Sequence, residues 1–139
     1  MTRTIKFRGK RLDDPQQWEY GYYQQDETDA WMHTLDGRVL RIIPDTLGQF
    51  TGLHDKNGHE IYEGDIVEVT SMRVESFGQK MTCEIVYDEK MACYDFKAPD
   101  RQRNICVSIL DVECKIIGNV HEPLKEDYKT TPTKNISWN

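Results

Sequence analysis

The chain has 139 residues, a length that fits one domain and allows an apolar core to form without disulfides or metals. Charged residues make up 30% and hydrophobic residues 37%, which is typical of a globular protein, and the formal net charge is −6. That charge argues against a general attraction to nucleic acid or anionic lipid. No apolar run reaches membrane-spanning length and no secretory signal is visible, so we expect a cytoplasmic protein with reduced cysteines.

The charge is unevenly distributed along the chain. Residues 1–12 contain five Lys and Arg and no acid, whereas the remaining residues contain 13 cations and 24 anions, a sum of −11. A basic end of this kind can bind an acidic partner. Because its cations alternate with Ile5 and Phe7, we expect them to lie on the solvent face of a strand.

Short alternating segments bounded by turn residues predict an all-β protein with little helix. Two hairpins are expected in the N-terminal part, formed by residues 4–8 with 18–23 and by residues 30–33 with 38–43. The strand 38–43 is apolar on both faces, which is typical of a strand that is buried twice or contacts another subunit. This region is too short to form a barrel alone, so we expect the rest of the chain or a second copy to cover its hairpins.

The C-terminal part shows strong turn signals at 55–58 and 63–65. Further strands are predicted at 66–70, 80–87, 91–96 and 112–120, with a bulge or bend at Ile116-Ile117. Residues 99–104 are predicted to be a polar loop, residues 105–110 are ambiguous between strand and helix, and residues 122–128 favour a short helix.

Residues 49–69 read QFTGLHDKNGHEIYEGDIVEV. This segment resembles the signature Q-[YF]-T-G-L-x-D-x-x-G-x-x-[IV]-[YF]-E-G-D-[IV]-V of the YopX family of phage and prophage proteins. The segments IKFRGKRLDDPQQWEYGYY and ECKIIGNVHEPLKE are similar to the opening and closing segments of that family. In the closing segment Pro123 directly follows Glu122, where the family usually has an intervening Asn.

The resemblance implies an N-terminal β-hairpin region at 1–48, followed by a C-terminal SH3-like β-barrel region at 49–126 and a tail at 127–139. Together these would form one compact domain. The family has no agreed biochemical role, so the resemblance supports a fold more than a function.

We interpret the signature as a structural motif. Glycines mark tight turns, aspartates accept backbone N–H groups in the bends, and the apolar pair fills one end of the barrel. The residues with these expected roles are Gln49, Thr51, Gly52, Asp55, Gly58, Ile61, Tyr62, Gly64 and Asp65.

A metal-dependent hydrolytic enzyme is an alternative for the same segment, because imidazoles and carboxylates are dense there. The residues concerned are His54, Asp55, His59, Glu60, Glu63 and Asp65. The turns already explain this polarity, so we expect no metal and no cofactor. Cys83 and Cys114 fall on inward faces, where core packing is expected, and no nucleophile motif is present. We therefore predict no catalytic residue and no enzymatic activity.

The basic N-terminus lies near several aromatic residues, and cations beside aromatic rings on a β-surface can bind single-stranded nucleic acid. The aromatic residues are Trp18, Tyr20, Tyr22, Tyr23 and Trp31. The acidic net charge instead favours a hairpin core with a solvated face. The leading hypothesis is a non-enzymatic binding or assembly protein that forms homo-oligomers. An unidentified protein is a further candidate partner. A nucleic-acid-binding accessory factor is the alternative.

Overall fold

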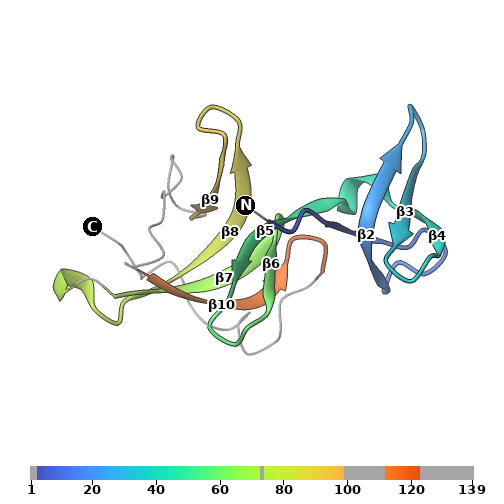
Figure 1. Cartoon of the computed structure of the whole chain (residues 1–139). Coiled ribbons are helices and arrows are strands. Elements are labelled where there is room, and N and C mark those ends of the chain that lie inside the picture. Colours follow the sequence, from blue (N-terminus) through green and yellow to red (C-terminus); the bar gives the residue numbers. More distant parts are fainter. Residues whose placement is uncertain (1–2, 73, 99–111, 123–139) are drawn as a thin grey trace. The chain divides into compact units, whose positions relative to one another are not determined.

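The structure is a computed structural model that describes residues 3–72, 74–98 and 112–122 (Figure 1). It is mostly β, with two antiparallel sheets, and its described helical elements are the short 3-10 helices Pro44–Thr46 (η1) and Val74–Ser76 (η2). The chain divides into two compact units, Met1–Gly52 and Leu53–Asn139. The predicted loop 99–104, the ambiguous segment 105–110, most of the predicted helix 122–128 and the tail lie outside the described residues.

The first unit contains a meander of four antiparallel strands, which we call the β1–β4 meander. Its strands are β1 (Phe7–Lys10), β2 (Trp18–Gln25), β3 (Ala30–Thr34) and β4 (Val39–Ile42). The order β4-β3-β2-β1-β5 places β5 (Gly48–His54) beside β1. Both predicted hairpins are confirmed, although the first strand begins three residues later than predicted and both strands of the first hairpin end two residues later.

The meander curls until its first and last strands meet. Arg11, directly after β1, forms an isolated antiparallel bridge with Ile42 of β4. Ile43 N donates to Lys10 O at 2.8 Å, and Leu12 N donates to Arg41 O at 3.0 Å. The hairpins thereby enclose an apolar cluster of their own.

That cluster consists of Ala30, Met32 and Ile42, with Phe7 and Leu47 packed against it. Met32 has no exposed surface, and the other two are 1% exposed. These residues alternate with polar and aromatic neighbours on β3 and β4, so one face of the meander carries the core and the other face does not. We call the second one the outer face.

The second unit contains a four-stranded sheet in the order β10-β7-β8-β9, and β6 (Glu60–Tyr62) pairs with β5. The strands of the four-stranded sheet are β7 (Asp65–Ser71), β8 (Lys80–Asp88), β9 (Cys93–Lys97) and β10 (Val112–Asn119). The predicted strands are confirmed, although β9 begins two residues later because Ala92 still belongs to the turn, with φ of 54°.

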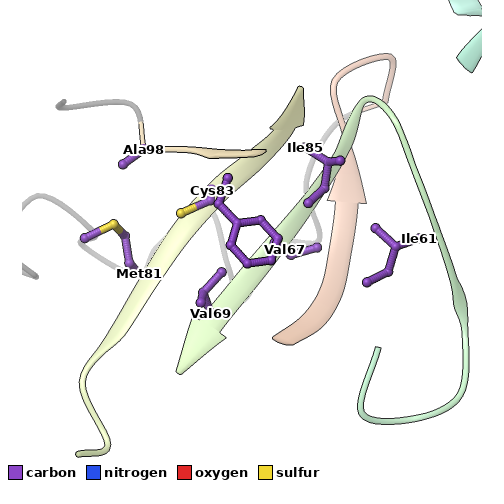
Figure 2. Packing of buried hydrophobic residues seen from close by; sticks show 8 residues of the cluster. Ile61, Val67, Val69, Met81, Cys83, Ile85 and Ala98 are labelled. Carbon is purple, nitrogen blue, oxygen red and sulfur yellow. The ribbon is translucent and has the colours of Figure 1, made fainter. Parts of the chain in front are cut away.

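The core of this unit forms where β6, β7, β8 and β9 contribute alternate side chains (Figure 2). Val67 and Val69 of β7 face Cys83 and Met81 of β8, respectively, across the ladder, and each is at most 3% exposed. Burial of apolar side chains on one face of each strand is what the alternating sequence predicted.

The predicted irregularity in the last strand is confirmed. β10 pairs with β7 from Val112 to Ile116, and the register then shifts between Ile116 and Gly118. An extra residue of this kind bends the strand.

The SH3-like barrel predicted for the second unit is not confirmed. Among the residues that the structure describes, β9 and β10 are the two edges of an open sheet. Residues 48 and 49, on either side of the predicted boundary, both lie on β5, where Gln49 pairs with Phe7 of β1.

Candidate functional site

The signature segment at 49–69 is spread over three strands and two turns. Gln49, Thr51 and Gly52 lie on β5, Ile61 and Tyr62 lie on β6, and the remaining motif residues lie in the turns or at the start of β7. Gly52, Gly58 and Gly64 have φ of 88°, 84° and 91°, in the left-handed region that favours glycine. The segment therefore alternates between paired strands and tight turns.

Asp55 holds the first turn and links it to the last strand. Its carboxylate accepts the backbone N–H groups of Asn57 and His59, each at 2.9 Å, and that of Ile116 at 3.1 Å. Burial raises the pKa of Asp55, but these three N–H groups and the neighbouring His59 outweigh it, so the pKa lies below its ordinary value. The side chain, which has no exposed surface, is thus kept as a carboxylate by its backbone donors.

Asp65 performs the same task in the second turn. It is 1% exposed and accepts the N–H of Tyr62 at 2.7 Å. Gly64, directly before Asp65, donates its N–H to Ile85 O, and its carbonyl oxygen accepts the N–H of Val120, each at 2.9 Å. The turn is therefore attached to β8 on one side and to the end of β10 on the other.

The apolar pair of the motif is buried. Ile61 and Tyr62 are both 2% exposed, and Ile61 belongs to the core cluster of the second unit (Figure 2). The Tyr62 hydroxyl donates to Glu60 Oε1 at 3.0 Å. A buried tyrosine whose hydroxyl has an acceptor is a stable packing element.

The histidines and carboxylates of this segment do not converge. His59 Nδ1 lies 3.6 Å from Asp55 Oδ2, and the His59 side chain is 72% exposed. Within residues 3–72, 74–98 and 112–122, no three His, Cys, Asp or Glu side chains come together in a group that would hold a metal ion. The two buried aspartates instead use their oxygens on the backbone.

The two cysteines predicted to face inward lie in or beside the core. Cys83 is 2% exposed, and Cys114 packs against the same cluster. Burial, with contributions from the charges of Asp55 and Glu113, raises the pKa of Cys114 to about 11. A thiol with so high a pKa is a poor nucleophile near neutral pH.

The outer face of the β1–β4 meander carries some of the basic and aromatic residues of the N-terminal part. Strand pairing places Lys10 opposite Trp18 and Arg8 opposite Tyr20. The Arg8 guanidinium lies 4.4 Å from the Trp18 ring centroid, and Lys10 Nζ lies 5.4 Å from it. These are cation–π distances.

The predicted solvent exposure of the basic residues is wrong for Arg8 and Lys10, which are 7% and 8% exposed. Their side chains lie over the indole rather than extending into water. The predicted aromatic hairpin core is also wrong, since Tyr20, Tyr22 and Tyr23 are 42%, 53% and 40% exposed. Ala30, Met32 and Ile42 form the core in their place.

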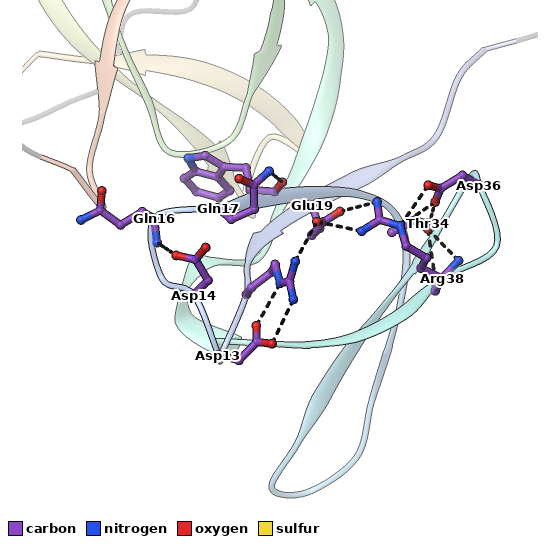
Figure 3. Close-up of polar contacts among 10 residues, drawn as sticks. Asp13, Asp14, Gln16, Gln17, Glu19, Thr34, Asp36 and Arg38 are labelled. Carbon is purple, nitrogen blue, oxygen red and sulfur yellow. Dashed lines mark hydrogen bonds and ion pairs between the residues drawn. The ribbon is translucent and has the colours of Figure 1, made fainter.

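A partly buried ion-pair network lies on the core side of the meander and was not predicted from the sequence (Figure 3). The Glu19 side chain is 7% exposed and accepts from Arg38 Nη1 at 3.2 Å and Nη2 at 3.1 Å. Arg11 Nη1 lies 3.9 Å from the same carboxylate and also pairs with Asp13. The only local signal was an acid placed between two aromatic residues of an alternating strand.

The fold and the site define an all-β protein of two units whose most distinctive segment is a turn-forming motif. A family model described as YopX protein matches residues 1–124. The chain therefore belongs to the YopX family. A search of curated proteins found no match. None of the helical elements in the described residues is long and apolar enough to cross a membrane.

Proposed function

We propose that this protein is a non-enzymatic binding or assembly module of a phage or prophage, and that it forms homo-oligomers in the cytoplasm. The supporting observation is an exposed apolar loop between β7 and β8. Val74 and Phe77 are 93% and 69% exposed there, and Met72, at the start of the loop, is 41% exposed. Scattered apolar side chains are normal on a surface, but several within one loop are typical of a contact site.

The absence of catalysis is proposed from how the motif uses its side chains. Asp55 and Asp65 are the buried carboxylates of the segment, and both accept backbone N–H groups. A metal-dependent hydrolase built on this segment would require them to release those donors and leave N–H groups unsatisfied. We therefore assign structural roles to the nine motif residues.

We also propose a division of the chain into regions and a barrel in the second of them. We divide the chain into a hairpin region at 1–48, a barrel region at 49–126 and a tail at 127–139. An SH3-like barrel in the second region is supported by the register shift after Ile116 in its last strand, because an irregularity of this kind lets a sheet curl.

Light scattering coupled to size-exclusion chromatography tests the assembly proposal. We expect the wild-type mass at micromolar concentration to be a multiple of 16.3 kDa. The double variant Val74→Asp with Phe77→Asp should shift to the monomer mass, because charges at a buried contact are costly. Met91→Asp is the matched control, since Met91 is 70% exposed at a different turn and its variant should keep the wild-type mass. A wild-type monomer at every concentration tested would overturn the proposal.

A second candidate function, a nucleic-acid-binding accessory factor, is favoured by a separate surface. That surface is the outer face of the β1–β4 meander, where cations and aromatic rings lie on adjacent strands.

A further inference from the structure

The loop between β7 and β8 presents apolar side chains on a backbone that is held in place. Ser71 N donates to Gln79 O at 2.8 Å, so the two ends of the loop are bonded to each other. The hydroxyl oxygens of Ser71 and Ser76 lie 2.6 Å apart, which ties the 3-10 turn of the loop to its first residue. Within this loop Val74 and Phe77 are 93% and 69% exposed. Side chains on a preorganised loop lose little freedom on binding, so they are suited to enter the surface of a partner.

The outer face of the β1–β4 meander carries a second apolar patch. Strand pairing places Tyr22, His33 and Val39 side by side across β2, β3 and β4, and Tyr20 precedes Tyr22 by two residues on the same side of β2. Val39, Tyr22 and Tyr20 are 56%, 53% and 42% exposed. We call these three residues the tyrosine patch. Tyrosine is enriched at protein contacts because its large ring offers apolar area together with a polar tip.

The cations of the outer face are already engaged within the chain. Arg8 and Lys10 are 7% and 8% exposed and lie over the Trp18 ring, and Arg41 forms an ion pair with Asp29. The outward-facing residues of β1–β4 include no Asp or Glu. The surface that remains for a partner is therefore aromatic and aliphatic, and it is best suited to apolar side chains.

Charge favours the first unit over the second as the surface that receives the loop. Residues 1–52 contain seven Lys and Arg and eight Asp and Glu, a net charge of −1, whereas residues 53–139 contain 11 and 16, a net charge of −5. A contact between two loops would bring two second units together, with the exposed Glu75 of each near the other. A loop on the tyrosine patch instead brings Glu75 to strands without outward-facing acids. Like charges at a contact are costly, so the second arrangement is favoured.

We propose that the β7–β8 loop of one copy docks on the tyrosine patch of a second copy, with Phe77 and Val74 packed against Tyr22 and Val39. This inference rests on the proposed assembly function, because it names the partner surface of the same loop. The contact joins two different surfaces and is therefore heterologous, so every copy offers one loop and one patch. Aromatic rings such as Phe77 and Tyr22 attract one another beyond the area that they bury.

Mixing two variants tests the proposal by light scattering at micromolar concentration. The loop variant, Val74→Asp with Phe77→Asp, and the patch variant, Tyr22→Asp, should each have the monomer mass of 16.3 kDa when alone. Their equimolar mixture should have twice that mass, because the loop variant keeps an intact patch and the patch variant keeps an intact loop. A variant that failed to fold could not supply its intact surface, so the mixture also checks folding.

Two further variants serve as controls. Tyr22→Phe keeps the ring and should keep the wild-type mass. Tyr87→Asp introduces the same charge at a tyrosine of similar exposure, 45%, on β8 of the second unit, and it should also keep the wild-type mass. A monomer mass for Tyr87→Asp would overturn the inference, because added charge would then separate the copies wherever it is placed.

The remaining outcomes separate this inference from the assembly proposal. A monomeric wild type, or a loop variant that keeps the wild-type mass, would overturn both. An oligomeric Tyr22→Asp beside a monomeric loop variant would overturn the inference alone, since the loop would then meet another surface, and so would a mixture that stays monomeric. If Tyr22→Asp keeps the wild-type mass but loses the affinity of the wild type for labelled oligothymidylate, the inference is overturned and the patch belongs to nucleic-acid binding.

Discussion

The carboxylate of Asp55 accepts the backbone N–H of Ile116 at 3.1 Å, across 61 positions of sequence. Nearby, Lys56 N donates to Cys114 O at 2.9 Å, so the 55–58 turn is attached to β10 at two points. The attachment lies just before the register shift of β10, between Ile116 and Gly118. The motif turn thus fixes the position of the strand where the strand bends.

Replacing Asp55 tests this attachment. Asp55→Ala removes an acceptor from three backbone N–H groups, and we expect a loss of about 2–3 kcal/mol in the free energy of unfolding, measured by urea denaturation. Asp88→Ala is the control, because Asp88 accepts the N–H groups of Lys90 and Met91 in an exposed turn. If both variants lose the same small amount of stability, the bond to Ile116 contributes nothing.

The same carboxylate should give a pH dependence. Its pKa in the folded chain is below the ordinary 3.8, because the backbone donors and His59 outweigh burial. Folding therefore gains stability from Asp55 above pH 3.8, and that gain is lost as the pH falls through the lowered pKa of the folded state. The free energies of unfolding of the wild type and of Asp55→Asn, measured by urea titration at a series of pH values from 5 downward, should converge at the acid end. Parallel curves would contradict the lowered pKa.

The turn at Gly64 should tolerate no side chain. Its φ of 91° strains any L-residue, and its N–H and C=O are both bonded to other strands, so the backbone has no freedom to adjust. We expect Gly64→Val to cost about 1–3 kcal/mol of unfolding free energy. Gly37→Val is a matched control, with φ of 92° in a hairpin turn that is open to solvent. Equal melting temperatures for the two variants would show that the φ angle alone matters.

The ion-pair network makes a separate prediction. Glu19→Ala removes the acceptor shared by Arg38 and Arg11, and since Glu19 is buried we expect a loss of about 1–3 kcal/mol. Lys80→Ala, which breaks the more exposed pair with Glu68, should have a smaller effect on the melting temperature. In 1 M salt part of the loss from Glu19→Ala should persist, because the Glu19 carboxylate is buried and buried charges are screened less than exposed ones. Its disappearance in salt would identify the network as a surface feature.

The fold was predictable from the sequence where its cause is local. Asn57-Gly58 and Asp36-Gly37 predicted their turns because few other residues accept those backbone angles, and Ile116-Ile117 predicted the bulge because alternation breaks there. Long-range pairing was not predictable in this way. Nothing near Asp55 indicates that it binds Ile116, and nothing near Arg11 indicates that it meets Ile42.

The character of the two sheet faces was predicted less well, for a physical reason. Alternation shows which residues share a face but does not show which face is covered. Arg8 and Lys10 were expected in water because they are charged, yet the Trp18 ring offers them a favourable position out of it. The signal for the candidate nucleic-acid surface is thus the coincidence of cations and aromatic residues on adjacent strands, and it requires the strand register.

The curl of the β1–β4 meander depends on a close approach between Gly9 and Ile42. A Cβ at Gly9 would lie 2.7 Å from Ile42 Cδ1 and 3.3 Å from Ile42 Cβ, well inside van der Waals contact. Gly9→Ala should therefore destabilise the protein by about 1–3 kcal/mol, the usual cost of overpacking. Ile42→Val removes the Cδ1 methyl and alone should cost about 0.5–1.5 kcal/mol.

The double variant is the informative one. If the two side chains compete for one space, Gly9→Ala in the Ile42→Val background should cost less than it does in the wild type, so the two losses will not add. Gly9→Ala combined with Ile85→Val is the control, because Ile85 is an equally buried isoleucine in the core of the second unit. Those two losses should add within about 0.5 kcal/mol. Additivity in both pairs, measured by urea denaturation, would mean that Gly9 is needed for its backbone and not for the space it leaves to Ile42.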